Sequence, residues 1–230
     1  MSNNQASILV TGGNGFVGKQ ICKLLSSRGI PVISISRSGK PAAIDAADYE
    51  QVRWISADVF NVPSWAHYLD ECKAVIHCIG INEEQPDKGI TYEKHIFQAA
   101  KVVADATKER GIHTFVYISA GSGAPDTPEG YMINKIAAEN YINELGLSAV
   151  IMKPGLIYGI EKPETIEEHK AMAVLMEDPE VAPYIRPNRP LSVATIARVA
   201  VAAALSQVRD NMLDVDGIEA ADQLLTSEFS

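Results

Sequence analysis

Residues 7–18 read SILVTGGNGFVG, a short apolar run followed directly by a glycine-rich turn. Gly12, Gly15 and Gly18 are spaced three residues apart, and helical periodicity begins at about Gly15. A strand that turns sharply into a helix needs small residues there, because side chains would block a ligand from the backbone. The free N–H groups and the dipole at the start of such a helix suit a pyrophosphate. The segment therefore predicts a nucleotide-binding turn, in preference to an ordinary glycine turn.

Short apolar runs alternate with helical patterns along the following chain. The expected strands are 7–11, 31–36, 52–56, 74–79, 114–119 and 148–152. The helices expected between them end at Gly29, Gly111 and Gly146. Strand, helix and strand at this rhythm give right-handed crossovers with helices on both faces of a sheet. The predicted fold class is α/β, a doubly wound parallel sheet (Rossmann) with a small C-terminal lobe.

The regular alternation of expected strands and helices ends after Met152. A helix is expected over 163–177, and a helix capped by Ser192 follows an extended loop that holds three prolines, Pro183, Pro187 and Pro190. We expect residues 1–230 to form a single NAD(P)-binding domain. Within it, residues 155–230 are expected to be a small lobe over the carboxyl edge of the sheet that covers the substrate.

The composition limits the classes of function. A chain of 230 residues with 47% apolar content and a net charge of −9 is globular, and it repels nucleic acid and anionic membranes. No uncharged apolar stretch reaches the ~18 residues of a membrane span. The three cysteines and five histidines match no metal-binding spacing, so no metal is expected. With no signal or transit peptide visible before the first strand, the expected location is cytoplasmic.

The second expected strand ends in Ser36-Arg37-Ser38, where the adenosine ribose of a dinucleotide lies in this type of fold. An acidic residue there would bind a free 2′-hydroxyl group, whereas a guanidinium group pairs with a 2′-phosphate. The sequence therefore favours NADP(H) as cofactor, with NAD(H) as the alternative. A solvated surface arginine is the competing interpretation of Arg37.

Ser119 ends the fifth expected strand, and Tyr131 and Lys135 follow at the start of a helix. A spacing of four residues places the phenol and the ammonium group on one helix face. We expect the ammonium group to lower the pKa of the phenol, which makes the pair an acid/base for alcohol and carbonyl chemistry. Lys135 can also bind the nicotinamide ribose. The competing interpretation is a solvated helix face.

Together these motifs resemble a short-chain dehydrogenase/reductase of the extended or atypical type, which includes the NAD-dependent epimerase/dehydratases. The segments that carry the resemblance are the glycine turn, Tyr131-x-x-x-Lys135, Ser119, Asp58-Val59, Cys78-Ile79-Gly80 and Lys153-Pro154-Gly155. Residues 7–160 match well and the remainder loosely. The chain is most similar to the atypical branch that contains the complex I accessory subunit and a ubiquinone-biosynthesis protein.

The resemblance implies further contacts with the dinucleotide. Asn14, Phe16 and Val17 would lie along the pyrophosphate, Asp58 and Val59 would contact the adenine, Cys78, Ile79 and Gly80 the adenosine ribose, and Pro154 and Gly155 the nicotinamide. It also implies hydride transfer to or from a small-molecule carbonyl or alcohol substrate, with Ser119, Tyr131 and Lys135 as the catalytic residues. Three residues depart from the pattern, because relatives commonly have asparagine at Ile96, a second serine at Ala120 and arginine at Lys153. The change at Ala120 leaves Ser119 or Ser122 as the hydroxyl that would polarise a substrate carbonyl. The alternative is a non-catalytic dinucleotide-binding scaffold or redox sensor with a protein partner.

Overall fold

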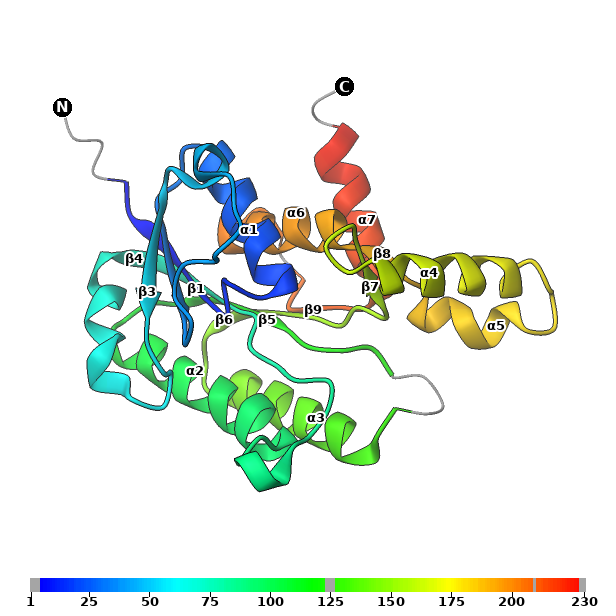
Figure 1. Cartoon of the computed structure of the whole chain (residues 1–230), viewed down its shortest axis with the longest axis horizontal. Helices are drawn as coiled ribbons and strands as arrows, with labels where there is room; N and C mark the ends of the chain where they lie inside the picture. The colour runs from blue at the N-terminus through cyan, green and yellow to red at the C-terminus, as the bar shows by residue number, and fades with distance from the viewer. Residues whose placement is uncertain (1–4, 123–126, 209, 228–230) are drawn as a thin grey trace.

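A seven-stranded parallel sheet forms the centre of the computed structural model, which describes residues 5–122, 127–208 and 210–227 (Figure 1). The strand order is β3-β2-β1-β4-β5-β6-β9, and every pairing is parallel. The bounds are β1 Ser7–Thr11, β2 Val32–Ser36, β3 Val52–Ser56, β4 Cys72–His77, β5 Thr114–Ile118, β6 Ser148–Met152 and β9 Met212–Leu213. The six expected strands and the doubly wound fold class are confirmed. The order reverses between β1 and β4, the point at which such sheets bind ligands.

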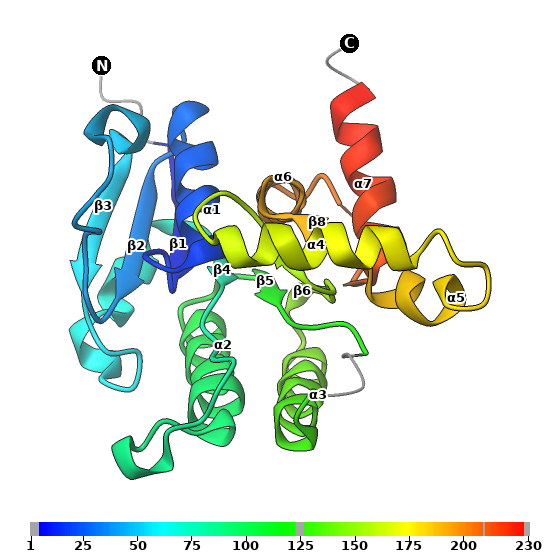
Figure 2. The ribbon, with the colours of Figure 1, turned by 45° about the vertical axis from the view of Figure 1, so that its right-hand side comes forward.

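Helices cover both faces of the sheet (Figures 1 and 2). One face carries α1 (Phe16–Ser27), α6 (Val193–Ala204) and α7 (Val215–Ser227), and the other carries α2 (Ala99–Glu109) and α3 (Glu129–Glu144). The segment η5 (Glu93–Gln98), a π-helical turn, precedes α2 directly. Shorter helical segments are η1 (Ala46–Tyr49), η2 (Val62–Ser64), η3 (Ala66–Glu71) and η4 (Pro86–Lys88). Gly29, Gly111 and Gly146 follow α1, α2 and α3 with positive φ, as the sequence predicts.

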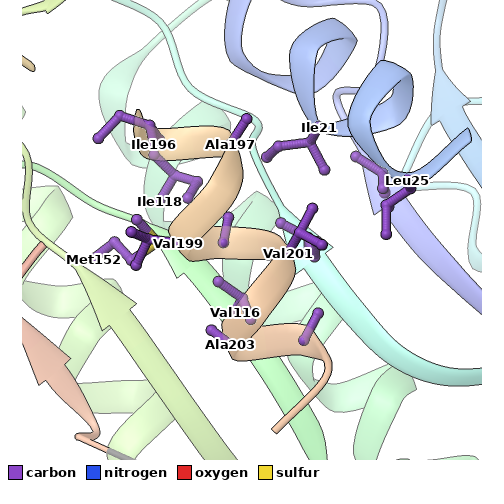
Figure 3. Close-up of a cluster of buried hydrophobic side chains, with 14 of the residues drawn as sticks. Ile21, Leu25, Val116, Ile118, Met152, Ile196, Ala197, Val199, Val201 and Ala203 are labelled. Atoms are coloured by element: carbon purple, nitrogen blue, oxygen red, sulfur yellow. The ribbon is translucent and has the colours of Figure 1, made fainter. Parts of the chain in front are cut away.

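Helix α6 is apolar on nearly every side, because it is packed between α1, α7 and the sheet. Figure 3 shows its side chains beside those of α1 and the strands. Ile196, Ala197, Val199, Val201 and Ala203 of this helix are buried. They belong to one hydrophobic cluster with side chains of α1, β5 and β6, namely Ile21, Leu25, Val116, Ile118 and Met152. This packing holds α1 on one face of the sheet, with the glycine turn at the carboxyl edge.

The stretch 155–230, expected as a lobe over the carboxyl edge, is divided between two places. The helices α4 (Pro163–Leu175) and α5 (Ala182–Ile185), the turn η6 (Arg186–Asn188) and the two-stranded sheet β7 (Ile157–Tyr158) with β8 (Leu191–Ser192) extend beyond that edge (Figure 2). In contrast, α6, β9 and α7 belong to the main layers.

Two local expectations in this stretch have opposite outcomes. The Ser192 cap is confirmed, because its hydroxyl accepts a hydrogen bond from the Thr195 amide at 3.0 Å. The expected extended loop is wrong at Pro183 and Pro187, which lie in the first turns of α5 and η6, whereas Pro190 lies outside any helix. Proline lacks only an N–H that a first helical turn leaves unpaired, and so it begins short helices as readily as it holds extended chain.

Candidate functional site

The glycine turn between β1 and α1 leaves open backbone at the carboxyl edge of the sheet. Gly12 has φ +75°, and a Cβ atom on Gly18 would lie 2.3 Å from the carbonyl oxygen of Gly12. Gly15 is the N-cap of α1 and supplies no side-chain cap, so the first N–H groups of the helix stay free. The turn therefore has the open backbone that a pyrophosphate site needs, and any larger residue at Gly18 would displace that backbone.

The end of β2 is shaped by short polar contacts beside this turn. The Asn14 side-chain amide donates to the Ser38 hydroxyl at 2.7 Å. The Ser36 hydroxyl donates to the carbonyl of Gly39 at 3.1 Å, and Gly39 has φ +63°. The Ser56 hydroxyl of β3 donates to the backbone carbonyl of Arg37 at 2.8 Å. The backbone that carries the Arg37 side chain is thus fixed from two strands.

A cavity of about 420 Å³ lies at this edge, and we call it the arginine cavity. The predicted cofactor residues that line it are Gly12, Asn14, Gly15, Ser36, Arg37, Ser38, Asp58, Val59, Cys78, Ile79 and Gly80. Among the lining residues that the sequence interpretation missed, three have basic side chains, namely Lys88 of η4 and Lys94 and His95 of η5. Basic residues at the start of a helix oppose its dipole, and this was the available signal for Lys94 and His95. With neutral histidine, three positive groups of the cavity face one negative group, Asp58.

A second cavity of about 390 Å³, the tyrosine cavity, adjoins the first. The predicted residues that line it are Gly15, Phe16, Val17, Gly18, Cys78, Ile79, Gly80, Ser119, Tyr131, Lys135, Pro154 and Gly155. Lys135 is 4% exposed, and its Nζ donates to the carbonyl of Ile118 at 3.0 Å. The same Nζ lies 5.7 Å from the centre of the Tyr131 ring. All the residues predicted for cofactor and catalysis therefore line one or both of two neighbouring cavities.

Burial sets the protonation of the Tyr131 and Lys135 pair. Burial lowers the pKa of Lys135 to about 8, although the Glu139 carboxylate acts in the opposite direction. Burial, and to a smaller degree the Tyr92 phenol, raises the pKa of Tyr131. The expected lowering of the Tyr131 pKa by lysine is therefore wrong, because burial is the main influence on this phenol. At neutral pH Tyr131 is a neutral phenol and thus a proton donor.

Ser119 takes part in a hydrogen-bonded chain that the motifs did not reveal. Its hydroxyl donates to Glu139 Oε1 at 2.5 Å, and Lys153 Nζ donates to Glu139 Oε2 at 2.7 Å. Ser119 and Glu139 are 5% and 4% exposed. Since the Ser119 hydroxyl donates its proton to Glu139, Ser119 offers a ligand only its lone pairs. Glu139 lies one helical turn after Lys135, and this spacing was the available signal for it.

Beneath both cavities, His77 ends β4 and is completely buried. Its Nδ1 lies 2.8 Å from the Thr11 hydroxyl, whereas its Nε2 has no hydrogen-bond partner among the described residues. Burial, reinforced by the charge of Lys135, lowers the His77 pKa to about 3. His77 is therefore a neutral residue of the sheet.

An outer cavity of about 350 Å³ borders Tyr131 on another side. Its lining is largely apolar or uncharged, and Glu168 is its one ionisable residue besides Tyr131 among the described residues. Across residues 5–122, 127–208 and 210–227, no cluster of three or more potential ligands is arranged to hold a metal ion. In the same ranges, none of the helices combines the length and apolar character needed to cross a bilayer.

The fold and these cavities define an α/β protein of the short-chain dehydrogenase/reductase type. The model of the NAD dependent epimerase/dehydratase family matches residues 8–227. The chain therefore belongs to this family, and the resemblance that its motifs indicate is confirmed.

Two curated proteins are similar to the chain in sequence. An uncharacterized chloroplastic protein of Arabidopsis thaliana is 39% identical over 167 residues, which cover 70% of this chain and 53% of that protein. This chain thus spans about half the length of that relative. MIOREX complex component 2 of Saccharomyces cerevisiae is 28% identical over 200 residues, covering 66% of this chain and 72% of the yeast protein. Because the Arabidopsis relative is named as chloroplastic, the expected cytoplasmic location stays a prediction.

A solved structure shares the fold. MoeE5 in complex with UDP-glucose and NAD aligns with a TM-score of 0.65 at 19% sequence identity, covering 96% of this chain and 82% of that chain. At this identity the similarity concerns the arrangement of strands and helices and leaves the ligands of this chain open.

Proposed function

We propose that the chain is an NADP(H)-dependent oxidoreductase that transfers hydride to or from a small carbonyl or alcohol, with Tyr131 moving the proton. The observation that carries the proposal is the continuity of the two cavities. The arginine and tyrosine cavities share Gly15, Cys78, Ile79, Gly80 and Ile81. A single extended ligand can therefore run from Arg37 past the glycine turn to Tyr131. A dinucleotide has this shape, with its pyrophosphate in the middle.

The charges of the arginine cavity support NADP(H) over NAD(H). A 2′-phosphate adds a dianion at the adenosine end, where Arg37 and two lysines line the cavity. NAD(H) offers only a hydroxyl group there, which would leave these cations without an anion. The pyrophosphate does not fill this role, because it would bind at the neighbouring glycine turn and not beside the basic side chains.

The residues around Tyr131 support proton transfer in step with hydride transfer. When bound, the nicotinamide supplies or accepts the hydride. The neutral phenol of Tyr131 donates its proton to a carbonyl oxygen in reduction and recovers one in alcohol oxidation. Lys135 gives one N–H to the Ile118 carbonyl, so its other two donors remain for ribose hydroxyls and the phenol. The outer cavity beside Tyr131 suits a compact substrate more than a nucleotide sugar.

Two measurements test this proposal. Fluorescence titration of the purified chain with NADPH and NADH is expected to show tighter binding of NADPH. Equal affinity, or a preference for NADH, would refute the role of Arg37. Tyr131→Phe is then expected to bind NADPH normally while its oxidation of NADPH with a panel of small aldehydes and ketones falls by about 10²-fold to 10⁴-fold.

A non-catalytic scaffold or redox sensor is the second candidate, because one relative is named as a component of the MIOREX complex. In that case the dinucleotide stabilises the fold for a protein partner. The wild-type chain would bind NADPH and turn over no member of the panel, and Tyr131→Phe would leave the partner interaction intact. Epimerase or dehydratase chemistry uses the same residues and would appear as turnover without net consumption of NADPH.

A further inference from the structure

Two side chains of η5, Lys94 and His95, line the arginine cavity from an element outside the strand ends of the cofactor motif. Lys94 Nζ lies 5.5 Å from the centre of the Phe60 ring, and the His95 ring meets the same ring edge-on with centroids 6.4 Å apart. Phe60 also lines the cavity, two residues after Asp58. The aromatic ring thus orders both basic side chains at the cavity wall.

The positive charge of this cavity is only partly balanced within the described part of the protein, where Asp58 is the one acid in the lining. Arg37, Lys88 and Lys94 form no ion pair with any acid in the described part of the chain. The chain has twenty-nine acidic residues for twenty basic ones, so acids are abundant. Unpaired bases gathered in one cavity of an acidic protein favour an anionic ligand. The pyrophosphate has its own site at the glycine turn, and a second anion is needed to match these cations.

His95 is placed to respond to that anion. It is 8% exposed, and its Nδ1 lies 3.3 Å from the carbonyl of Thr91, which leaves Nε2 free to take a proton. Burial lowers the pKa of His95, and the charges of Arg37 and Lys94 lower it further, while Asp58 and the Thr91 carbonyl act in the opposite direction. The ring is therefore neutral at pH 7. A dianion placed among these groups reverses the local field and favours the imidazolium form.

We propose that Lys94 and His95 complete, with Arg37, a site for the 2′-phosphate of the dinucleotide, and that His95 takes up a proton when this phosphate binds. The proposal rests on the NADP(H) binding proposed above. It adds Lys94 and His95 as further phosphate ligands and links phosphate binding to pH. By reciprocity, a proton taken up on binding makes the phosphate bind more tightly as the pH falls toward the ordinary histidine range.

Isothermal titration calorimetry with two nucleotides tests the site without any substrate. Adenosine 2′,5′-bisphosphate carries the second phosphate, and AMP lacks it. Lys94→Met is expected to weaken the bisphosphate about tenfold, as for the loss of one charge-assisted hydrogen bond, and AMP less than twofold. Lys108→Met, an exposed lysine on the following helix that does not line the cavity, is the matched control and should change neither. Equal weakening of both nucleotides by Lys94→Met, or none, overturns the proposal.

The proton is counted by repeating the titrations at pH 7 in two buffers of different ionisation enthalpy. The phosphate itself titrates near pH 6 and contributes equally to wild type and His95→Gln. The wild type is expected to take up more protons than His95→Gln, by up to one per bisphosphate bound, and equal counts overturn the role of His95. NADPH and NADH of equal affinity in the wild type would refute the proposed function itself. A preference for NADPH that Arg37→Met removes and Lys94→Met leaves intact would refute this site alone.

Discussion

The arginine and tyrosine cavities adjoin at one sheet edge and share five lining residues. They differ in whether their charged side chains have partners within the protein. In the arginine cavity, the basic side chains lack ion-pair partners among the described residues. Beside the tyrosine cavity, Lys135, Glu139 and Lys153 are held by fixed hydrogen bonds. Unpaired cations gain free energy from a ligand's phosphate, whereas proton transfer needs groups already in position. The difference favours a role in ligand binding for the arginine cavity and a role in positioning reacting groups for the tyrosine cavity.

The glycine turn serves both regions, and breaking it should have the largest effect. In Gly18→Val, the new Cβ lies 2.3 Å from the Gly12 carbonyl oxygen, so the turn must move. We expect NADPH and NADH to bind at least about a hundredfold more weakly, because the free N–H groups of α1 lose their alignment. The measurement is fluorescence titration. Gly130→Ala is the control, since its Cβ makes only ordinary contact at 3.5 Å. If Gly18→Val keeps its affinity for both nucleotides, this role of the turn is contradicted.

The fixed charges near the tyrosine cavity predict a loss of stability when one partner is removed. Lys153→Met leaves the Glu139 carboxylate buried without its cation. We expect the free energy of unfolding to fall by about 2 to 3 kcal/mol, less than for a fully buried pair because the Lys153 side chain is 23% exposed. Urea unfolding measures the change.

Two further variants control that experiment. Lys170→Met breaks an ion pair whose side chains are 64% and 73% exposed, and it should cost no more than about 0.5 kcal/mol. The double variant Glu139→Gln with Lys153→Met should recover part of the loss, because the unpaired carboxylate is gone. Equal effects of Lys153→Met and Lys170→Met would contradict the contrast between buried and solvated pairs.

The parts of the site that follow from local sequence were predictable. The glycine turn and Arg37 come directly after a strand and Asp58 two residues after one, and parallel strands bring their carboxyl ends to one edge. Tyr131 and Lys135 share a helix face because of their spacing alone. Six strands were likewise predictable from their apolar runs, whereas β9, with two residues, is too short to show a pattern.

The remainder depends on tertiary contacts. Lys94 and His95 reach the arginine cavity only because η5 packs beside the loop after β3, and no motif links these segments. The carboxylate of Glu139 meets Ser119 and Lys153 across 20 and 14 residues of sequence. The pKa of Tyr131 depends on burial, which the Tyr-x-x-x-Lys spacing does not reveal. The sequence thus predicts which side chains lie at the site, whereas tertiary packing determines their pKa values and which of them donate hydrogen bonds.

A smaller effect concerns the neutral His77 beneath the two cavities. Its pKa of about 3 in the folded protein lies below the ordinary value of about 6.5 in the unfolded chain. Between these values the unfolded chain binds the proton and the folded protein does not, so stability is lost as the pH falls from about 6.5 toward 3. His77→Gln removes this titration. Between pH 7 and pH 5, the wild type should lose about 2 kcal/mol more than the variant in urea unfolding. Equal losses would show that His77 accepts a proton in the folded state.

The smallest expected effect tests which atom of Ser119 faces the substrate. A serine that donates to a developing oxyanion is worth about 10²-fold to 10³-fold in turnover. The Ser119 proton instead goes to Glu139, so Tyr131 is left as the donor to the carbonyl oxygen. We therefore expect Ser119→Ala to lower NADPH oxidation with a reactive aldehyde less than tenfold, with NADPH affinity unchanged. Ser119→Thr, which keeps the hydroxyl, serves as the comparison. A loss of a hundredfold or more in Ser119→Ala, absent in Ser119→Thr, would mean that the Glu139 hydrogen bond breaks during the reaction.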